Sequence, residues 1–212
     1  MSRKHPIVAV TGSSGAGTST VKDALQHIFQ RVGAQAAFVE GDSFHRFDRK
    51  HMKKELTKAK KEGRKLSHFG PEGNLFDKQL ELFRSYGETG TGEYRHYIHN
   101  EEEAVEYEAE PGTFTPWEPI PSNTDLLFYE GLHGGVVDGE INMADEVDLL
   151  IGVCPTINLE WVQKINRDTA ERGYRPEDVM DTIYRRMSDY MHYILPQFSK
   201  THINFQRIPL TD

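Results

Sequence analysis

Short runs of apolar and β-branched residues recur along the chain, and longer segments with a different period separate them. The runs cover 6–12, 36–42, 125–131, 148–155 and 203–209. Such runs are typical of strands that are buried on both faces, as in a parallel sheet covered by helices. We therefore expect a central sheet built from these segments.

Several of the segments between the runs carry apolar residues three and four positions apart, which is the period of an amphipathic helix. The expected helices cover 18–32, 49–61, 76–86, 158–172 and 177–195. Strands that alternate with helices predict an α/β fold with a mostly parallel central sheet covered on both faces.

The stretch 67–122 departs from this alternation, because it is richer in glycine, proline and turn signals. Within it, residues 94–99 (YRHYIH) alternate as a strand does. A chain of 212 residues is typically one domain, so we assign 1–212 to a single domain. We interpret 67–122 as a loop-rich insertion that carries active-site loops.

The net charge of −8 argues against general nucleic-acid binding, but the charge is unevenly spread. Residues 46–65 contain ten Lys and Arg against three acids, a local charge of +7. Residues 101–110 contain six glutamates. Both segments suit a solvated surface, and the start of the basic one, beside Asp42, also suits attraction of an anionic substrate.

The first apolar run is too short for a signal peptide or a membrane span. Cys154 is the only cysteine, so no intrachain disulfide can form. We expect a cytoplasmic protein without a membrane partner.

The segment GSSGAGTS has the spacing of a phosphate-binding loop, G-x-x-x-x-G-K-[ST], but Thr18 stands where the lysine belongs. In such a loop, backbone N–H groups and the following helix N-terminus bind phosphates, and Ser19 would offer its hydroxyl to Mg²⁺. The alternative is a Gly/Ser-rich turn that caps a helix. The expected nucleotide-binding residues are Gly12, Ser13, Ser14, Gly15, Ala16, Gly17, Thr18, Ser19 and Thr20.

Glu130 stands at the end of the apolar residues in the run DLLFYEG. A carboxylate at the carboxyl end of a buried strand is where folds of this kind place a metal-binding acid beside the phosphates. The alternative is a strand-end glutamate in a salt bridge.

Asp42 ends the run before SFHRFDR, and His45 and Arg49 follow closely. Phosphoryl transfer needs an anion to accept the hydroxyl proton and cations to hold an anionic substrate. This grouping therefore suits the acceptor side of a kinase. The alternatives are a capping or turn aspartate and a structural histidine.

The expected helix 158–172 has one apolar face and one charged face. Arg167, Asp168 and Arg172 fall within about 80° of Lys164 on a helical wheel. A solvated face with i,i+4 ion pairs would look the same. Our hypothesis is that Lys164, or an arginine beside it, supplies the charge that Thr18 lacks.

Five segments together carry a family resemblance: GSSGAGTST, EGDSFHRFDR, LLFYEGLHGGVV, INLEWVQKINRDTAERGY and PQFSKTHINFQR. They closely resemble the bacterial (class I) phosphoribulokinases, which are related to the uridine kinase-like kinases. The resemblance covers essentially the whole chain. It implies a three-layer P-loop kinase fold and phosphorylation of D-ribulose 5-phosphate by ATP, with Mg²⁺, to ribulose 1,5-bisphosphate in the Calvin cycle.

The resemblance also implies residue roles. Asp42 resembles the catalytic base, Asp168 a second essential carboxylate, and Glu130 the acid on the metal side. The remaining implied ligands are the phosphate-contacting Lys164 and Arg172, the sugar-phosphate ligands His45, Arg49 and Arg167, and the acceptor-pocket residues Tyr97 and His99.

Family members continue well past the segment INFQR, so the resemblance implies that their C-terminal region is absent here. A homo-oligomer is expected, with NADH and AMP as effectors where the effector site is intact. Two rival functions stay open: another small-molecule kinase, such as one for uridine or pantothenate, and a weakly active nucleotide-binding regulatory module.

Overall fold

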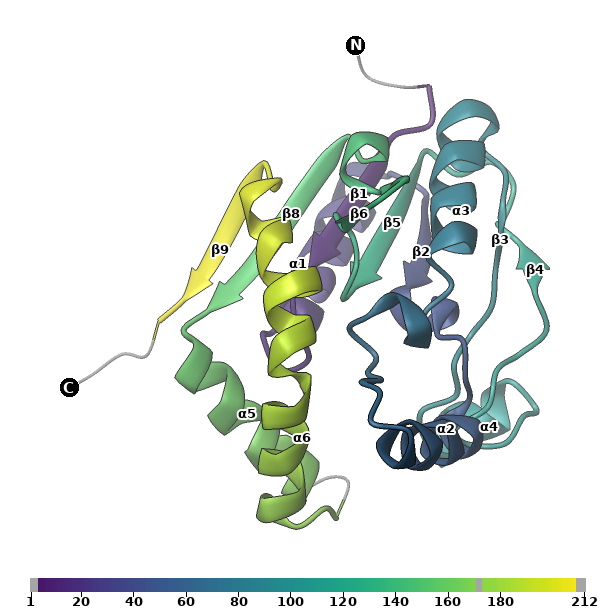
Figure 1. The fold of residues 1–212 in the computed structure, drawn as a ribbon. Helices are drawn as coiled ribbons and strands as arrows, with labels where there is room; N and C mark the ends of the chain where they lie inside the picture. The colour runs from purple at the N-terminus through teal and green to yellow at the C-terminus, as the bar shows by residue number, and fades with distance from the viewer. Residues whose placement is uncertain (1–3, 171–172, 209–212) are drawn as a thin grey trace.

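The computed structural model describes residues 4–170 and 173–208, and a five-stranded parallel sheet forms its centre (Figure 1). The strand order across the sheet is β2-β5-β1-β8-β9. The bounds are β1 (Ile7–Thr11), β2 (Ala36–Glu40), β5 (Leu126–Gly131), β8 (Leu149–Pro155) and β9 (Ile203–Arg207). Each of the predicted apolar runs contains one of these strands, so the expected α/β fold is confirmed.

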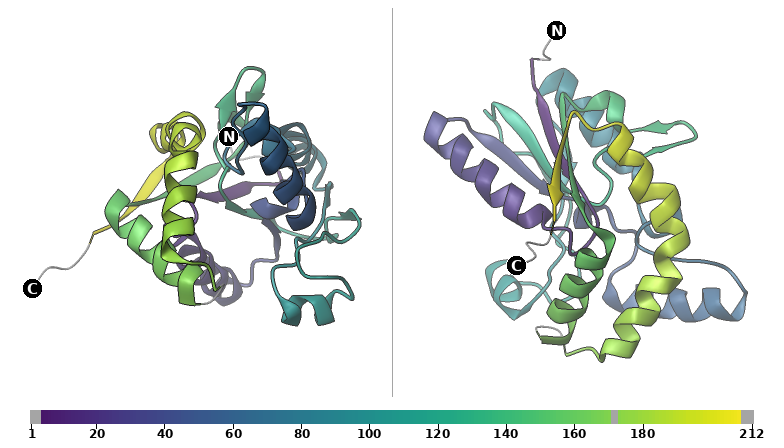
Figure 2. Two further views of the ribbon diagram at one scale, coloured as in Figure 1. Left: turned by 60° about the horizontal axis from the view of Figure 1, so that its bottom comes forward. Right: turned by 90° about the vertical axis from the view of Figure 1, so that its left-hand side faces the viewer.

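Helices cover both faces of the sheet (Figure 2). On one face, α1 (Thr18–Val32) packs against a core that includes Val10 and Phe128. On the other face, α3 (Phe76–Thr89) packs against a core that includes Ala9 and Tyr129. Neighbouring residues of one strand therefore enter opposite cores, which explains why the strands are apolar throughout.

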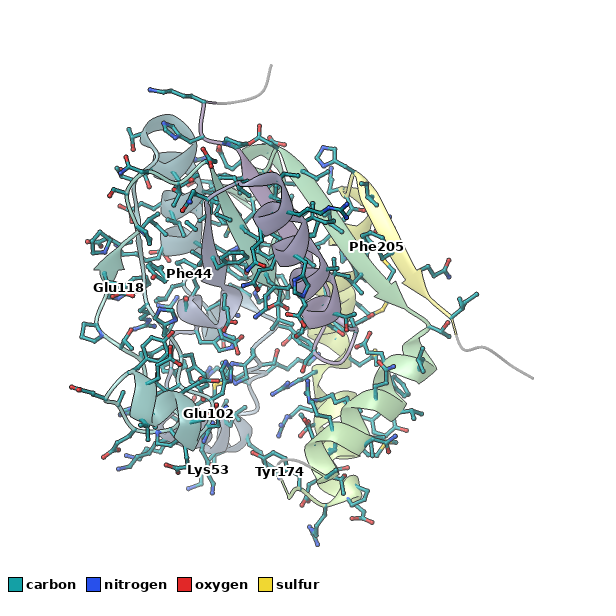
Figure 3. The ribbon with its side chains drawn as sticks, turned by 180° about the vertical axis from the view of Figure 1, so that it is seen from behind. Phe44, Lys53, Glu102, Glu118, Tyr174 and Phe205 are labelled. Atoms are coloured by element: carbon teal, nitrogen blue, oxygen red, sulfur yellow. The ribbon has the colours of Figure 1, made fainter. Side chains whose placement is uncertain are left out.

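The other helices lie beyond the carboxyl ends of the strands (Figure 1). They are α2 (Arg49–Lys61), α4 (Glu101–Glu106), α5 (Ile157–Ala170) and α6 (Pro176–Asp189). Lys53 of the basic α2 and Glu102 of the acidic α4 lie at the same end of the molecule, whereas Phe205 lies on the edge strand (Figure 3). No helix in the described ranges is both long enough and apolar enough to cross a bilayer.

Short antiparallel pairs complete the fold. β3 (Glu93–Tyr94) pairs with β4 (Glu118–Pro119), and β6 (Val137–Asp138) pairs with β7 (Ile141–Asn142).

The strand predicted at 94–99 was wrong beyond Tyr94. The segment continues with a single bridge between Tyr97 and Phe114. Side-chain bonds hold it instead, since the Arg95 guanidinium donates to the carbonyl oxygens of Ser43 and His45 at 2.9 and 2.7 Å. Two of its apolar residues still face inward, since Tyr94 packs against the main core and Ile98 is fully buried.

The last predicted helix ends earlier than expected. α6 stops at Asp189, and a π-helical turn (Tyr190–Ile194) and a 3₁₀ turn (Leu195–Ser199) follow. Pro196 has no N–H to donate to the preceding turn, so the α-helical hydrogen-bond pattern cannot continue through it.

Candidate active site

The phosphate-loop segment connects β1 to α1 and has the backbone that such a loop requires. Gly15 has φ of 99°, in the left-handed region where glycine is favoured. Helix α1 starts directly after Gly17, and that cap residue has no side chain to bond the first N–H groups. The donors of the first helical turn therefore point out of the helix end, as an anion site needs.

The loop lies directly against α5. The Ser13 hydroxyl donates to the Glu160 carboxylate, and the Arg167 guanidinium donates to the Ser14 hydroxyl at 2.9 Å. A Cβ on Gly15 would lie 3.3 Å from the Cβ of Lys164, closer than side chains normally pack. Three consecutive loop residues thus contact the helix that was predicted to supply the missing charge.

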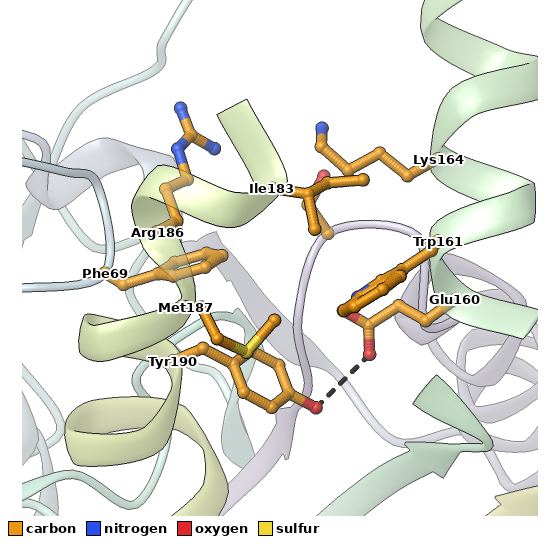
Figure 4. Close-up of a pocket in the computed structure, with 9 residues that line it drawn as sticks. Phe69, Glu160, Trp161, Lys164, Ile183, Arg186, Met187 and Tyr190 are labelled. Atoms are coloured by element: carbon orange, nitrogen blue, oxygen red, sulfur yellow. Dashed lines mark hydrogen bonds between the residues drawn. The ribbon is translucent and has the colours of Figure 1, made fainter. Parts of the chain in front are cut away.

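Glu160 ties this contact to α6 and the turn that follows it. The Tyr190 hydroxyl donates to the other Glu160 oxygen at 3.4 Å (Figure 4). Burial raises the pKa of Glu160, although the bonds to Ser13 and Tyr190 act in the opposite direction.

An ion-paired cluster occupies the charged face of α5. Lys164 Nζ lies 2.6 Å from Asp168 Oδ2, and Arg167 Nε and Nη2 lie 3.0 and 2.9 Å from Asp168 Oδ1. Burial acts to raise the pKa of Asp168, but the two cations outweigh burial and lower it. Burial lowers the pKa of Lys164, against the pull of Asp168. The face is therefore partly buried and paired, unlike a freely solvated helix face.

Arg186 of α6 joins this region and was not singled out from the sequence. Arg186 and Lys164 come from opposite sides of the same pocket, and both charged ends lie above the rings of Phe69 and Trp161 in this view (Figure 4). Burial lowers the pKa of Arg186 to about 10. Arg186 follows the buried Ile183 by three residues, and this helical spacing places Arg186 on the inner face of α6.

Glu130 is the next-to-last residue of β5, the strand between β1 and β2. In the register of the sheet it lies opposite Val10 of β1 and Glu40 of β2. Burial raises the pKa of Glu130, and a hydrogen bond from the Thr18 hydroxyl acts against burial. The residue in place of the loop lysine therefore contacts the predicted metal-side acid.

Asp42 lies in a 3₁₀ turn (Gly41–Phe44) that follows β2 directly. Its Oδ1 lies 3.1 Å from His45 Nε2, and its Oδ2 lies 3.6 Å from His99 Nε2. Burial acts to raise the pKa of Asp42, but the two histidines outweigh burial and hold it well below its usual range. The carboxylate is thus kept ionised and faces two histidines.

The turn that carries Asp42 passes very close to the end of β5. A Cβ on Gly41 would lie 2.5 Å from the Tyr129 hydroxyl oxygen and 3.0 Å from Gly131 Cα. Only glycine leaves room for this approach, which brings Asp42 beside the strand end that carries Glu130.

The predicted acceptor residues gather around Asp42. Arg49 begins α2 and donates to the His99 carbonyl oxygen at 2.8 Å, and it also bonds the Tyr97 hydroxyl. The ring of Tyr97 lies 4.9 Å from that of His99 and 6.3 Å from that of His45. Residues from two separate motifs, EGDSFHRFDR and RHYIH, therefore lie close together in the fold.

Arg167 is not in this cluster. It contacts Ser14 and Asp168 on the phosphate-loop side, so its predicted sugar-phosphate role would require a ligand that reaches across. Arg172, predicted as a phosphate-contacting cation, lies outside the described residues.

Comparison with known proteins agrees with this geometry. Residues 7–212 match the model of the phosphoribulokinase / uridine kinase family. The chain is 58% identical to the chromosomal phosphoribulokinase of Cupriavidus necator over 213 residues, which covers all of this chain and 73% of that one. It is 54% identical to the phosphoribulokinase of Nitrobacter vulgaris with the same coverage.

Solved structures give the same result. The phosphoribulokinase from Rhodobacter spheroides superposes with a TM-score of 0.88 at 52% identity, over all of this chain and 73% of that chain. D-glycerate 3-kinase from Cryptococcus neoformans shares only the fold, with a TM-score of 0.60 at 13% identity over 90% of this chain and 79% of that one. The chain belongs to the phosphoribulokinase / uridine kinase family.

Proposed function

We propose that the chain transfers the γ-phosphoryl group of ATP to the 1-hydroxyl of D-ribulose 5-phosphate and so forms D-ribulose 1,5-bisphosphate, a step of the Calvin cycle. The observation that carries this proposal is the order β2-β5-β1. It aligns Asp42, Glu130 and the phosphate loop along one edge of the sheet. Adjacent strands are about 4.8 Å apart, so base and loop are separated by roughly 10 Å, which suits an acceptor and a phosphoryl group in line.

Asp42 is the proposed general base. In phosphoryl transfer the acceptor hydroxyl gives up its proton as the new bond forms, and an ionised carboxylate within reach can take it. The low pKa of Asp42 keeps the carboxylate ionised at neutral pH, so it is free to accept a proton. Its position beside the acceptor, rather than a high proton affinity, would carry the role.

Mg²⁺ is the proposed metal, held by Glu130 and the Ser19 hydroxyl together with nucleotide phosphates. These are oxygen ligands, and burial of Glu130 without a full counter-charge suits a cation there. The described part of the chain contains no group of three or more His, Cys, Asp or Glu that could hold a metal alone. That finding suits Mg²⁺, which usually shares its ligands with phosphates and water.

Arg49, Tyr97 and His99 are the proposed ligands of the sugar phosphate. His45 was also predicted for that role, but each of its ring nitrogens already has a protein partner. A cationic pocket beside the base favours an acceptor that already carries a phosphate over a neutral one such as uridine.

We infer a single kinase domain in the cytoplasm. The homo-oligomer and the NADH and AMP effectors stay predictions.

The direct test is a turnover assay with ATP and Mg²⁺ against ribulose 5-phosphate, uridine and pantothenate. We expect a product only with ribulose 5-phosphate, and inorganic phosphate should compete with it. Preference for uridine or pantothenate would identify another small-molecule kinase. Nucleotide binding without turnover of any acceptor would favour the regulatory module.

Lys164→Met should lower kcat by about 10²–10³-fold while ATP binding changes little. The substitution keeps the aliphatic stem and removes a charge that acts most strongly on the transition state. Steady-state kinetics and ATP titration measure the two effects. The exposed Lys200→Met is the matched control and should behave like the parent.

Adding Thr18→Lys to Lys164→Met should restore part of the lost activity, because the loop then carries its own cation. If Lys164→Met alone turns over like the parent, Lys164 is not the replacement for the loop lysine, and Arg186 becomes the next cation to test.

Asp42→Asn should reduce kcat by about 10²–10⁴-fold or more, because the amide keeps the size of the side chain but cannot accept the proton. ATP affinity should stay close to that of the parent. Near-normal turnover by this variant would show that Asp42 is only a turn residue.

Arg49→Ala should raise KM for ribulose 5-phosphate by about 10- to 150-fold, the range expected for a lost charge-assisted contact. Lys50→Ala, which changes the exposed neighbour on α2, is the control and should leave that KM unchanged. An increase confined to the KM for ATP would assign Arg49 to the nucleotide instead.

A further inference from the structure

We propose that Asn74 is a positioning residue that keeps His45 doubly protonated, so that the His45 cation holds the Asp42 carboxylate in place for the acceptor hydroxyl. The proposal rests on the proposed role of Asp42 as base. Asn74 itself lies in the loop between α2 and α3, and nothing in its sequence neighbourhood marks it as functional.

The orientation of the Asn74 amide follows from its contacts. Asn74 is 2% exposed, and its Nδ2 donates to the carbonyl oxygens of His68 at 2.8 Å and Gly70 at 2.7 Å. A flipped amide would place Oδ1 against both carbonyl oxygens and lose two hydrogen bonds. Asn74 Oδ1 therefore faces His45 Nδ1, at 2.9 Å, and can only accept.

The other ring nitrogen of His45 also faces an acceptor. Its Nε2 lies 3.1 Å from Asp42 Oδ1, and an ionised carboxylate has no proton to donate. Both ring nitrogens must then carry hydrogen for both contacts to be hydrogen bonds, which is the imidazolium form. Burial acts to lower the pKa of His45, but Asp42 and Asn74 outweigh burial and raise it.

The other titratable groups near His45 do not stabilise this cation. They are His68, Arg95, Tyr97, His133 and Arg186, with Arg46 on the Asn74 carbonyl oxygen and His99 on the far side of Asp42. The ring of His68 lies 4.3 Å from that of His45 in a tilted arrangement, and burial, His45 and Arg186 lower the pKa of His68 well below the usual value. Burial lowers the pKa of His133 to about 3, so His68 and His133 are neutral beside the cation.

The main chain holds Asn74 independently of its side chain. Residues 45 and 74 form a β-bridge, and Leu75 N donates to Phe44 O at 2.8 Å. The Arg46 guanidinium donates to the Asn74 carbonyl oxygen at 2.8 Å. A change confined to the Asn74 side chain should therefore leave the loop near its present position.

The two carboxylate oxygens of Asp42 have different surroundings. His45 occupies Oδ1, whereas His99 Nε2 lies 3.6 Å from Oδ2, which is longer than a hydrogen bond. Oδ2 therefore keeps lone pairs for the acceptor hydroxyl. Loss of the Asn74 contact would weaken the His45 cation and free the carboxylate to rotate.

The first experiment needs no substitution of Asn74 and no catalysis. In the full chain labelled with ¹⁵N-histidine, both His45 nitrogens should show imidazolium shifts at neutral pH, with the signals assigned by their loss in His45→Gln. A neutral His45 tautomer at neutral pH would overturn the proposal. Because this readout is independent of the substrate, its failure is distinguishable from failure of the proposed kinase function.

The second experiment compares Asn74→Leu with Asn74→Asp. Leu removes the acceptor, so the titration midpoint of His45 should fall below that of the parent. Asp keeps an acceptor oxygen, so the midpoint should stay at or above the parent value. Since the cation exists only below this midpoint, the basic limb of the pH–kcat profile should move to lower pH in Asn74→Leu alone.

At a pH near neutrality, Asn74→Leu should lose roughly ten- to a hundredfold in kcat with the KM for ATP unchanged, as misplacement of a reacting group predicts. Asn74→Asp loses the same two bonds donated by Nδ2 as Asn74→Leu but keeps the acceptor oxygen, so it should retain clearly more of the parent kcat than Asn74→Leu. Equal losses in both variants without a difference in the His45 midpoint would mean that Asn74 only ties the loop together, and would overturn the proposal.

Discussion

The parallel register of β2, β5 and β1 is the constraint on which the site depends. It brings Glu40 level with Glu130, and Thr11 level with Gly131, so three connections leave the sheet at the same height. Each strand end carries one part of the proposed chemistry: the turn after β2 carries Asp42, the last residues of β5 include Glu130, and the phosphate loop follows β1. The backbone hydrogen bonds between neighbouring strands fix these relative positions. Side chains that are far apart in the sequence therefore meet at the strand ends, although no single sequence motif contains them.

The residues that were predictable from sequence are those whose signal is periodic or motif-based. The strand at 36–40 and the helix at 18–32 follow from the spacing of apolar residues, because burial on both faces or on one face leaves a pattern. Asp42 and Glu130 follow from their place at strand ends. Tyr97 and His99 came from the resemblance, and the strand expected around them is mostly irregular.

Asn74 could not be predicted in this way. Its amide is held by carbonyl oxygens of a loop that has no period, so its orientation exists only in the folded chain. The periodicity of α6 places Arg186 on the buried face of the helix. From sequence alone, however, a charged residue on an apolar face looks like an exception to the pattern, and its role becomes clear only from the residues around it. Hydrogen-bond satisfaction in irregular segments is a tertiary property, and it carries no local sequence signature.

The contacts between the phosphate loop and α5 have a consequence for the order in which the protein matures. Ser13 meets Glu160 and Ser14 meets Arg167 across separations of 147 and 153 residues. Contacts of such long range form late in folding, because a long stretch of chain must be ordered before they can close. During synthesis the loop leaves the ribosome early, while its cationic helix follows only after β8. A nascent chain therefore carries the glycine-rich half of the nucleotide site for most of its synthesis without the charged half.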